Sequence, residues 1–254
     1  MLGIFVLLTI IYFLFRVFLT DKFETRNKVN VMKWTALSIY LVTIIGLQVT
    51  NTNTYIKKMC GKYDSSKAVL FTIIPNLLIF GALIAILIAL PGWKAPFSNT
   101  FGYGAAYMMG IKTSFNTLLK TDIDNDLMKK IIQDKSLIVN EITPSNFDLF
   151  VAKMSDNNLL TKSYETLQGF ANNPDGLDPV KEQPYLDAYK GLFSAVVMKD
   201  MVAEGMWYLL TGALVITMIT NMVAELECDK STADMKREYK ESGSVRSKME
   251  SIKE

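Results

Sequence analysis

Residues 68–90 read AVLFTIIPNLLIFGALIAILIAL and contain no Asp, Glu, Lys or Arg. A second run without these residues, GMWYLLTGALVITMITNMVA, occupies residues 205–224. A helix rises about 1.5 Å per residue, so about 20 apolar residues cross the roughly 30 Å hydrocarbon layer of a bilayer. Both runs have this length, and the sequence therefore predicts an integral membrane protein.

Two further apolar segments precede these runs, at residues 1–20 and 34–50. We expect residues 1–20 to be a retained signal-anchor helix, because they lack a basic start and a small-residue cleavage pattern. Arg16 is expected to snorkel toward the headgroups. The strongly apolar part of residues 34–50 is only about 14 residues long, which leaves a tilted span, a re-entrant segment or an interfacial helix open.

Residues 112–200 have the composition of a small water-soluble domain. Their apolar positions recur at helical spacing, with a helix start signal, TPS, at residues 143–145 and a turn, NNPDG, at residues 172–176. No proline interrupts the chain from Tyr185 onward, so a helix can run continuously from there into the last span. Residues 226–254 form a charged tail of mixed sign, which alone would be disordered or a marginal helix.

The predicted fold is therefore all-α: a polytopic membrane protein with about four transmembrane helices and a small helical domain between the third and fourth. The predicted order is span 1–20, span or re-entrant helix 34–50, span 68–90, interfacial segment 91–111, polar domain 112–200, span 203–225 and tail 226–254.

Few polar side chains interrupt the predicted spans. Pro75 removes one backbone hydrogen bond and should kink the third helix, and Asn76 needs a partner in the bilayer. A packing kink with an interhelical hydrogen bond is favoured over a hinge or ion site, because no charged residue accompanies the pair. Glu204 lies at the mouth of the last span, where pairing with a neighbour is favoured over a proton relay, and Asn221 offers a polar contact.

Aromatic and basic residues flank the predicted spans at the expected depth of the headgroups. Membrane-interface anchors are predicted at Trp34, Trp93, Lys94, Trp207 and Tyr208. The segment after the third span is dense in glycine and aromatic residues, which is typical of close packing on a membrane surface or a partner. Partner contacts are predicted there at Phe97, Phe101, Tyr103 and Tyr107.

The residue inventory argues against catalysis, a cofactor or a metal site. The chain has no histidine, the commonest general base and a frequent metal ligand. Residues 122–126 have the D-x-D-x-D spacing of an EF-hand, but Leu127 and Gln133 occupy the positions that need glycine and glutamate. Phosphate-binding glycine loops and nucleophile-elbow motifs are absent from the sequence. A net charge of +2 also argues against a nucleic-acid partner.

The two cysteines, Cys60 and Cys228, each lie just outside an apolar run. Unpaired thiols are the favoured interpretation, and a single bridge stays open if both lie on one oxidising side. The sidedness of the chain also stays open. The weak positive-inside bias places both termini inside and the polar domain outside. The lack of N-glycosylation sequons instead favours a domain that never meets the glycosylation machinery.

Three motifs carry a resemblance to membrane-spanning virion proteins of nucleocytoplasmic large DNA viruses. They are PGWKAPFSNTFGYG at residues 91–104, Cys60-Gly61 before the third span, and EGMWYLLTG at residues 204–212. The resemblance implies a minor capsid or inner-membrane protein, placed in host endomembranes during assembly and then in the virion internal membrane beneath the capsid. It implies no catalytic residues. It also implies that the 112–200 domain and the charged tail contact other capsid or membrane proteins.

The leading hypothesis from the sequence is thus a structural virion membrane protein that anchors the capsid shell to the lipid bilayer. A small channel or transporter subunit is the main alternative, suggested by Pro75, Asn76, Glu204 and Asn221. An accessory subunit of an organellar membrane complex is a third possibility.

Overall fold

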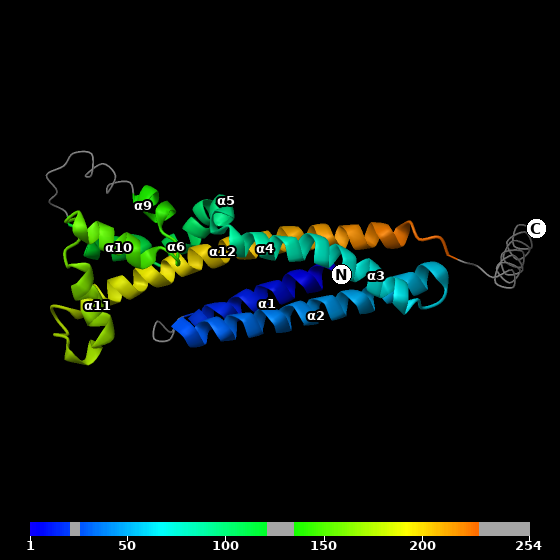
Figure 1. Cartoon of the computed structure of the whole chain (residues 1–254), viewed down its shortest axis with the longest axis horizontal. Helices are drawn as coiled ribbons and strands as arrows, with labels where there is room; N and C mark the ends of the chain where they lie inside the picture. The colour runs from blue at the N-terminus through cyan, green and yellow to red at the C-terminus, as the bar shows by residue number, and fades with distance from the viewer. Residues whose placement is uncertain (21–25, 121–134, 229–254) are drawn as a thin grey trace, which may run out of the picture.

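The computed structural model describes residues 1–20, 26–120 and 135–228. Within these ranges the chain is helical, apart from connecting turns and an isolated β-bridge between Leu119 and Leu160. The fold class is therefore all-α, as predicted. Long helices form an elongated array, and shorter helices gather around one end of it (Figure 1).

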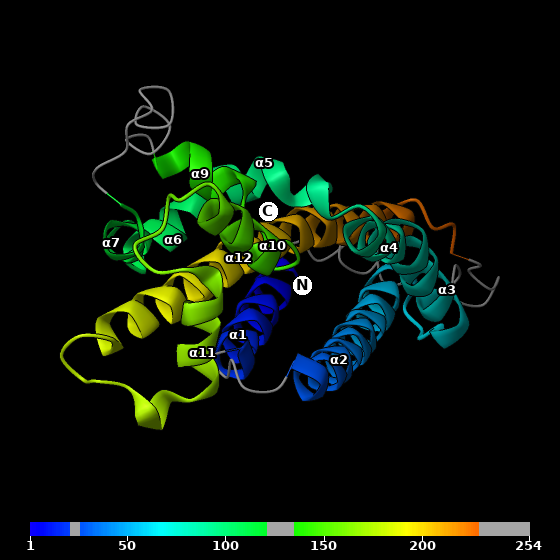
Figure 2. The same cartoon turned by 60° about the vertical axis from the view of Figure 1, so that its left-hand side comes forward.

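Four helical segments run side by side, and we call them the bundle. They are α1 (Leu2–Thr20), α2 (Arg26–Cys60), the run of α3 (Ser65–Pro75), η1 (Asn76–Gly81) and α4 (Ala82–Ala89), and the second half of α12 (Gln183–Ala224). Figure 2 shows α1 between α2 and α12. Among the described residues, three helical stretches are long and apolar enough to cross a membrane: 31–60, 65–89 and 183–224. The apolar helix Leu2–Val17 within α1 is shorter.

Helix α2 extends the bounds predicted for residues 34–50 and agrees with the spanning alternative left open for them. It is one unbroken helix from Arg26 to Cys60, so the segment is neither re-entrant nor short. Every fourth side chain from residue 36 to residue 56 is buried, including the polar Gln48 and Thr52. These two polar side chains lower the hydropathy of the helix. They are buried because the third helical segment supplies their hydrogen-bond partners.

Polar side chains join α2 to the third helical segment inside the bundle. The Asn76 Nδ2 group donates to Gln48 Oε1 at 2.6 Å and to the Thr72 carbonyl oxygen at 2.8 Å. One turn away, Thr72 Oγ1 donates to Thr52 Oγ1 at 3.2 Å. Pro75 lacks the N–H that would bond to the preceding turn, and the helix is π-helical immediately after it. Asn76 therefore has the interhelical partner expected of a packing kink.

Asn76→Leu is expected to lower the free energy of unfolding by about 1 kcal/mol, because Gln48 loses its partner while it remains buried. The thermal unfolding midpoint of the detergent-solubilised chain measures this loss. Asn221→Leu is the matched control, since the Asn221 side chain is exposed on α12. Equal shifts in both variants would show that the interhelical bond contributes nothing specific.

Aromatic side chains fill the centre of the bundle. Tyr208 of α12 is buried and stacks with Tyr12 and Tyr40, at ring-centroid distances of 6.4 and 6.1 Å. Nearby, Gly212 lies directly against the Phe5 ring, and a Cβ atom there would overlap it. The prediction of Tyr208 as an interface anchor is therefore wrong, because its ring belongs to the core rather than to the bundle surface.

Shorter helices and the first half of α12 enclose a second apolar core, and we call this part the head. The helices are α6 (Tyr103–Met108), α7 (Ile111–Leu118), α9 (Lys135–Glu141), α10 (Phe147–Asp156), α11 (Tyr164–Asn172) and the single turn η4 (Pro174–Gly176). Phe115, Phe147 and Tyr189 are among its fully buried side chains. The start signal at residues 143–145 precedes α10 closely, and the D-x-D-x-D motif lies outside the described residues.

Helix α12 belongs to both parts of the structure. It has 42 residues, which at 1.5 Å per residue is about 63 Å, twice the hydrocarbon thickness of a bilayer. Only its second half can therefore lie within a membrane, and its first half passes through the head (Figure 1). The predicted continuity of this helix is confirmed.

The segment at residues 91–111 is more regular than its glycine content indicates. It consists of short helical pieces along α12: η2 (Pro91–Lys94), α5 (Ala95–Phe97), η3 (Ser98–Gly102) and then α6. Gly102 lets this segment approach the backbone of α12 at Lys199, where a Cβ would collide with the carbonyl group. The segment thus connects the bundle to the head.

Candidate functional site: the charged junction

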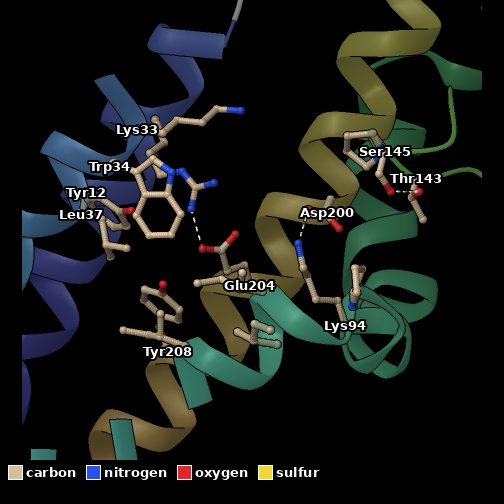
Figure 3. Close-up of a pocket in the computed structure, with 16 residues that line it drawn as sticks. Tyr12, Lys33, Trp34, Leu37, Lys94, Thr143, Ser145, Asp200, Glu204 and Tyr208 are labelled. Atoms are coloured by element: carbon tan, nitrogen blue, oxygen red, sulfur yellow. Dashed lines mark hydrogen bonds and ion pairs between the residues drawn. The ribbon is translucent and has the colours of Figure 1, made fainter. Parts of the chain in front are cut away.

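A cavity of about 350 Å³ lies where the bundle meets the head. Its walls come from α1, α2, α4, α12, the short segment after α4 and the turn at residues 143–145 (Figure 3). Charged and hydroxyl groups line one part of it, and Leu37, Ile84, Leu87 and Ile88 line another. The cavity is therefore amphipathic. We call it the junction cavity.

One wall carries a buried ion pair between the first and last helices of the bundle. Arg16 Nη1 lies 2.7 Å from Glu204 Oε1, and the two side chains are only 11% and 14% exposed. The guanidinium also lies 5.4 Å from the centre of the Phe13 ring, within cation–π range. Arg16, which was expected to snorkel toward the headgroups, thus directs its guanidinium at Glu204 of α12. The structure contains the pairing with a neighbour that was favoured for Glu204.

A second ion pair stands one helical turn away on α12. Lys94 Nζ lies 2.6 Å from Asp200 Oδ2, with both side chains mostly buried. Asp200 and Glu204 are four residues apart, so they project from one face of the helix. Figure 3 shows Lys94 reaching Asp200 from below while Lys33 and Trp34 lie across the cavity. Lys94, predicted as a headgroup anchor, ties the segment after α4 to α12 through this pair.

The three tryptophans of the chain all lie near the junction. Trp34 lines the cavity and is 55% exposed. Trp207 donates its Nε1–H to the Trp93 carbonyl oxygen at 3.1 Å, and its ring lies 4.9 Å from that of Phe97. Tryptophan concentrates at the boundary between hydrocarbon and water in membrane proteins. The interface role predicted for the tryptophans stays a prediction, and the structure adds that all three lie around one junction.

Lys33 is the cation of the cavity that has no recorded carboxylate partner within the part of the chain that the structure describes. Opposite it, the hydroxyl groups of Thr143 and Ser145 lie 2.9 Å apart, and either can donate to the other. Among the described residues that line this cavity, three cations face two carboxylates, a net charge of +1 by simple count.

Comparison with known protein families, curated proteins and solved structures found no match to this chain.

The charged groups of the junction can hold helices together and can bind an anion. Among the described residues, no three His, Cys, Asp or Glu side chains converge as a set that would hold a metal ion. The two carboxylates of the cavity are each held by a cation. Such groups fix the relative position of three helices, and they attract an anion at the remaining lysine.

The predicted partner-contact residues divide into two pairs. Phe97 packs against Trp207, and Tyr103 packs against the core of the head. Phe101 and Tyr107 remain 57% and 54% exposed, and Met108 beside them is also exposed. Only the second pair is thus available on the surface. Asn221 is exposed as well, so the polar contact expected for its side chain is absent from the described structure.

At the opposite end of the bundle, Cys60 and Cys228 form a disulfide, with Cα atoms 5.3 Å apart. This corrects the favoured interpretation of two unpaired thiols. The partners are separated by 168 positions, and no local pattern predicts which distant cysteines meet. The parallel course of α2 and α12 brings them together, since both helices end on the same side of the bundle (Figure 1).

Cys60→Ser is expected to abolish a mobility difference that the native chain shows between reducing and non-reducing gels. The bridge closes a large covalent loop, so the oxidised unfolded chain is more compact and migrates faster. Cys228→Ser is the matched control and should behave identically. Labelling of both cysteines by maleimide in the unreduced native chain would contradict the bridge.

Proposed function

We propose that this chain is a non-enzymatic structural membrane protein that holds its helical head in a fixed pose at one surface of a bilayer. One observation carries the proposal: α12 runs without a break from the core of the head into the core of the bundle. A continuous helix fixes the orientation of the head relative to the bundle. The two ion pairs of the junction hold α1 and the segment after α4 against this helix. The head is then a separate domain inserted between the last two of four spans.

The fourth span in this proposal is α1. It has 19 residues, which at 1.5 Å per residue is about 28 Å, close to the thickness of the hydrocarbon layer. One face packs into the bundle through Phe5, Thr9 and Tyr12. Its other face exposes only apolar side chains over most of its length, such as Leu7 and Leu14. An exposed apolar stripe beside three candidate spans is stable against lipid.

The disulfide supports an orientation. Disulfides persist in oxidising compartments and are rare in the cytosol. We therefore place the end of the bundle with Cys60 and Cys228 on the luminal or external side, and the head on the cytosolic side. This agrees with the lack of N-glycosylation sequons and opposes the weak positive-inside bias. Protease added to sealed vesicles from the cytosolic side should cleave the head and spare the loop around Tyr63.

The setting that we propose is a virion, where the chain fastens the capsid shell to the internal membrane. A shell that assembles in the cytosol meets the membrane on the side assigned to the head. Phe101, Tyr107 and Met108 offer it an exposed aromatic and thioether surface, the residue types that are enriched at protein interfaces. The charged tail is a second proposed contact for capsid or membrane proteins.

Photo-cross-linking in purified virus particles tests this role. A photoreactive residue at Tyr107 should form adducts with shell proteins, whereas the same residue at Tyr63, exposed at the disulfide end, should not. Particles whose membranes and detergent-stripped shells both lack the chain would overturn the proposal. Equal labelling of the shell from both positions would also overturn it.

The bonding of the intramembrane polar groups favours a scaffold over a channel or transporter. Asn76 is bonded to Gln48, and Glu204 is paired with Arg16. Conduction needs groups that exchange partners with an ion or proton, and here each group already has a partner inside the bundle. Proteoliposome flux that is lost in Glu204→Gln would instead support transport.

A further inference from the structure

We infer that the junction cavity binds the headgroup of one anionic phospholipid, with the lipid phosphodiester beside Lys33. The inference rests on the proposed function only in placing the junction at the bilayer surface, and it requires no protein partner. It follows from three properties of the cavity: its charge balance, its hydrogen-bond donors and its apolar wall.

Charge balance selects an anion. Arg16 pairs with Glu204 and Lys94 pairs with Asp200, while Lys33 has no carboxylate within ion-pair distance among the described residues. The excess of one positive charge matches the single negative charge of a phosphodiester. A partly buried cation without a counter-ion is costly in a low-dielectric setting, so a bound anion stabilises the junction.

The donors around the cavity suit phosphate oxygens. A lysine ammonium has three N–H donors, and Lys94 donates one of them to Asp200. The hydroxyl groups of Thr143 and Ser145 line the same cavity; one O–H is used in the bond between them, and the other is left to donate to an acceptor in the cavity. Donors from α2, from the segment after α4 and from the head therefore converge on one space (Figure 3). A phosphodiester bound there would link the bundle to the head.

The apolar wall distinguishes a lipid from free phosphate. Leu37 of α2 and Ile84 and Ile88 of α4 continue the cavity toward the middle of the bundle, and Ile88 is exposed. Acyl chains attached to the phosphate would lie along these side chains, on the side of the cavity away from the head. Trp34 at the rim marks the depth at which headgroups lie. A free phosphate would leave this apolar wall uncovered.

The test measures lipid retained by the full-length chain. The chain is reconstituted in nanodiscs of phosphatidylcholine with a minor fraction of phosphatidylglycerol, extracted in mild detergent and analysed by native mass spectrometry. The native chain should retain one phosphatidylglycerol. Lys33→Gln should lower this retention about tenfold, because it removes the charge-assisted contact. Lys62→Gln removes the same charge from an exposed site at the disulfide end and should leave retention unchanged.

Several outcomes would overturn the assignment. Equal retention of phosphatidylcholine and phosphatidylglycerol would mean that headgroup charge is not recognised. Stabilisation by inorganic phosphate as great as that by phosphatidylglycerol vesicles would mean that the site takes the free anion. Equal losses in Lys33→Gln and Lys62→Gln would mean a diffuse surface effect. Cross-linking from Tyr107 to shell proteins is a separate readout, so failure of the lipid assignment and failure of the capsid role are distinguishable.

Discussion

Glu204→Gln is expected to lower the free energy of unfolding by about 3 kcal/mol, the largest effect that we expect from a single side-chain charge in this chain. Arg16 would keep its positive charge but lose the carboxylate 2.7 Å away, in a site where both side chains are mostly buried. The loss is large because a charge that stays buried after its partner is removed is poorly solvated. Thermal and denaturant unfolding of the detergent-solubilised chain measure it.

Two variants separate the buried pair from a general effect of charge. Glu225→Gln makes the same chemical change at an exposed residue at the end of α12 and should cost almost nothing. The double variant Arg16→Met with Glu204→Met removes both charges and should recover more than half of the loss, because no buried charge is then left over. If the double variant is as unstable as the sum of the two single variants, the ion pair is not the cause.

Gly102→Ala is expected to destabilise the head by about 2 to 3 kcal/mol. A Cβ at this position would overlap the Lys199 carbonyl oxygen and lie 3.1 Å from the carbonyl carbon, so backbone must move. The Lys199 side chain cannot relieve the contact either, since it is buried and its Nζ donates to the Val139 carbonyl oxygen at 2.6 Å. Protease resistance of the head and the unfolding midpoint both report the change.

Gly104→Ala is the matched control for this effect. It lies two residues away on the same segment, and an added Cβ there meets no atom within 4 Å. Because alanine also has the higher helix propensity, the control should be neutral or slightly stabilising. Equal stability of the two variants would show that η3 does not pack on α12 as closely as described.

Prediction from the sequence succeeded where a local pattern was sufficient. The charge-free runs at residues 68–90 and 205–224 lie in two of the three helices that can span a membrane, and the absence of proline after Pro184 predicted the continuity of α12. Prediction was incomplete for residues 34–50, because polar residues such as Gln48 lower the hydropathy. The partner of Gln48 is Asn76 on another helical segment, which hydropathy does not take into account.

The candidate site was only partly predictable. Glu204, Trp34 and Lys94 were identified individually as residues at span ends, which hydropathy and residue type can reveal. Arg16 and Asp200 were not assigned to a site, because their roles depend on partners far away in the chain. No sequence pattern singled out Lys33. Whether a lysine has a carboxylate partner is seen only when its neighbours in the folded chain are known.

The sequence by itself determined which segments are helical and which of them prefer hydrocarbon, because periodicity and transfer free energy are properties of short stretches of chain. Tertiary structure alone decided the partners: Cys60 with Cys228, Asn76 with Gln48, and two basic residues with two acids on one face of α12. Pairing depends on the order and direction in which helices pack, and a charge or thiol carries no information about which distant residue will face it.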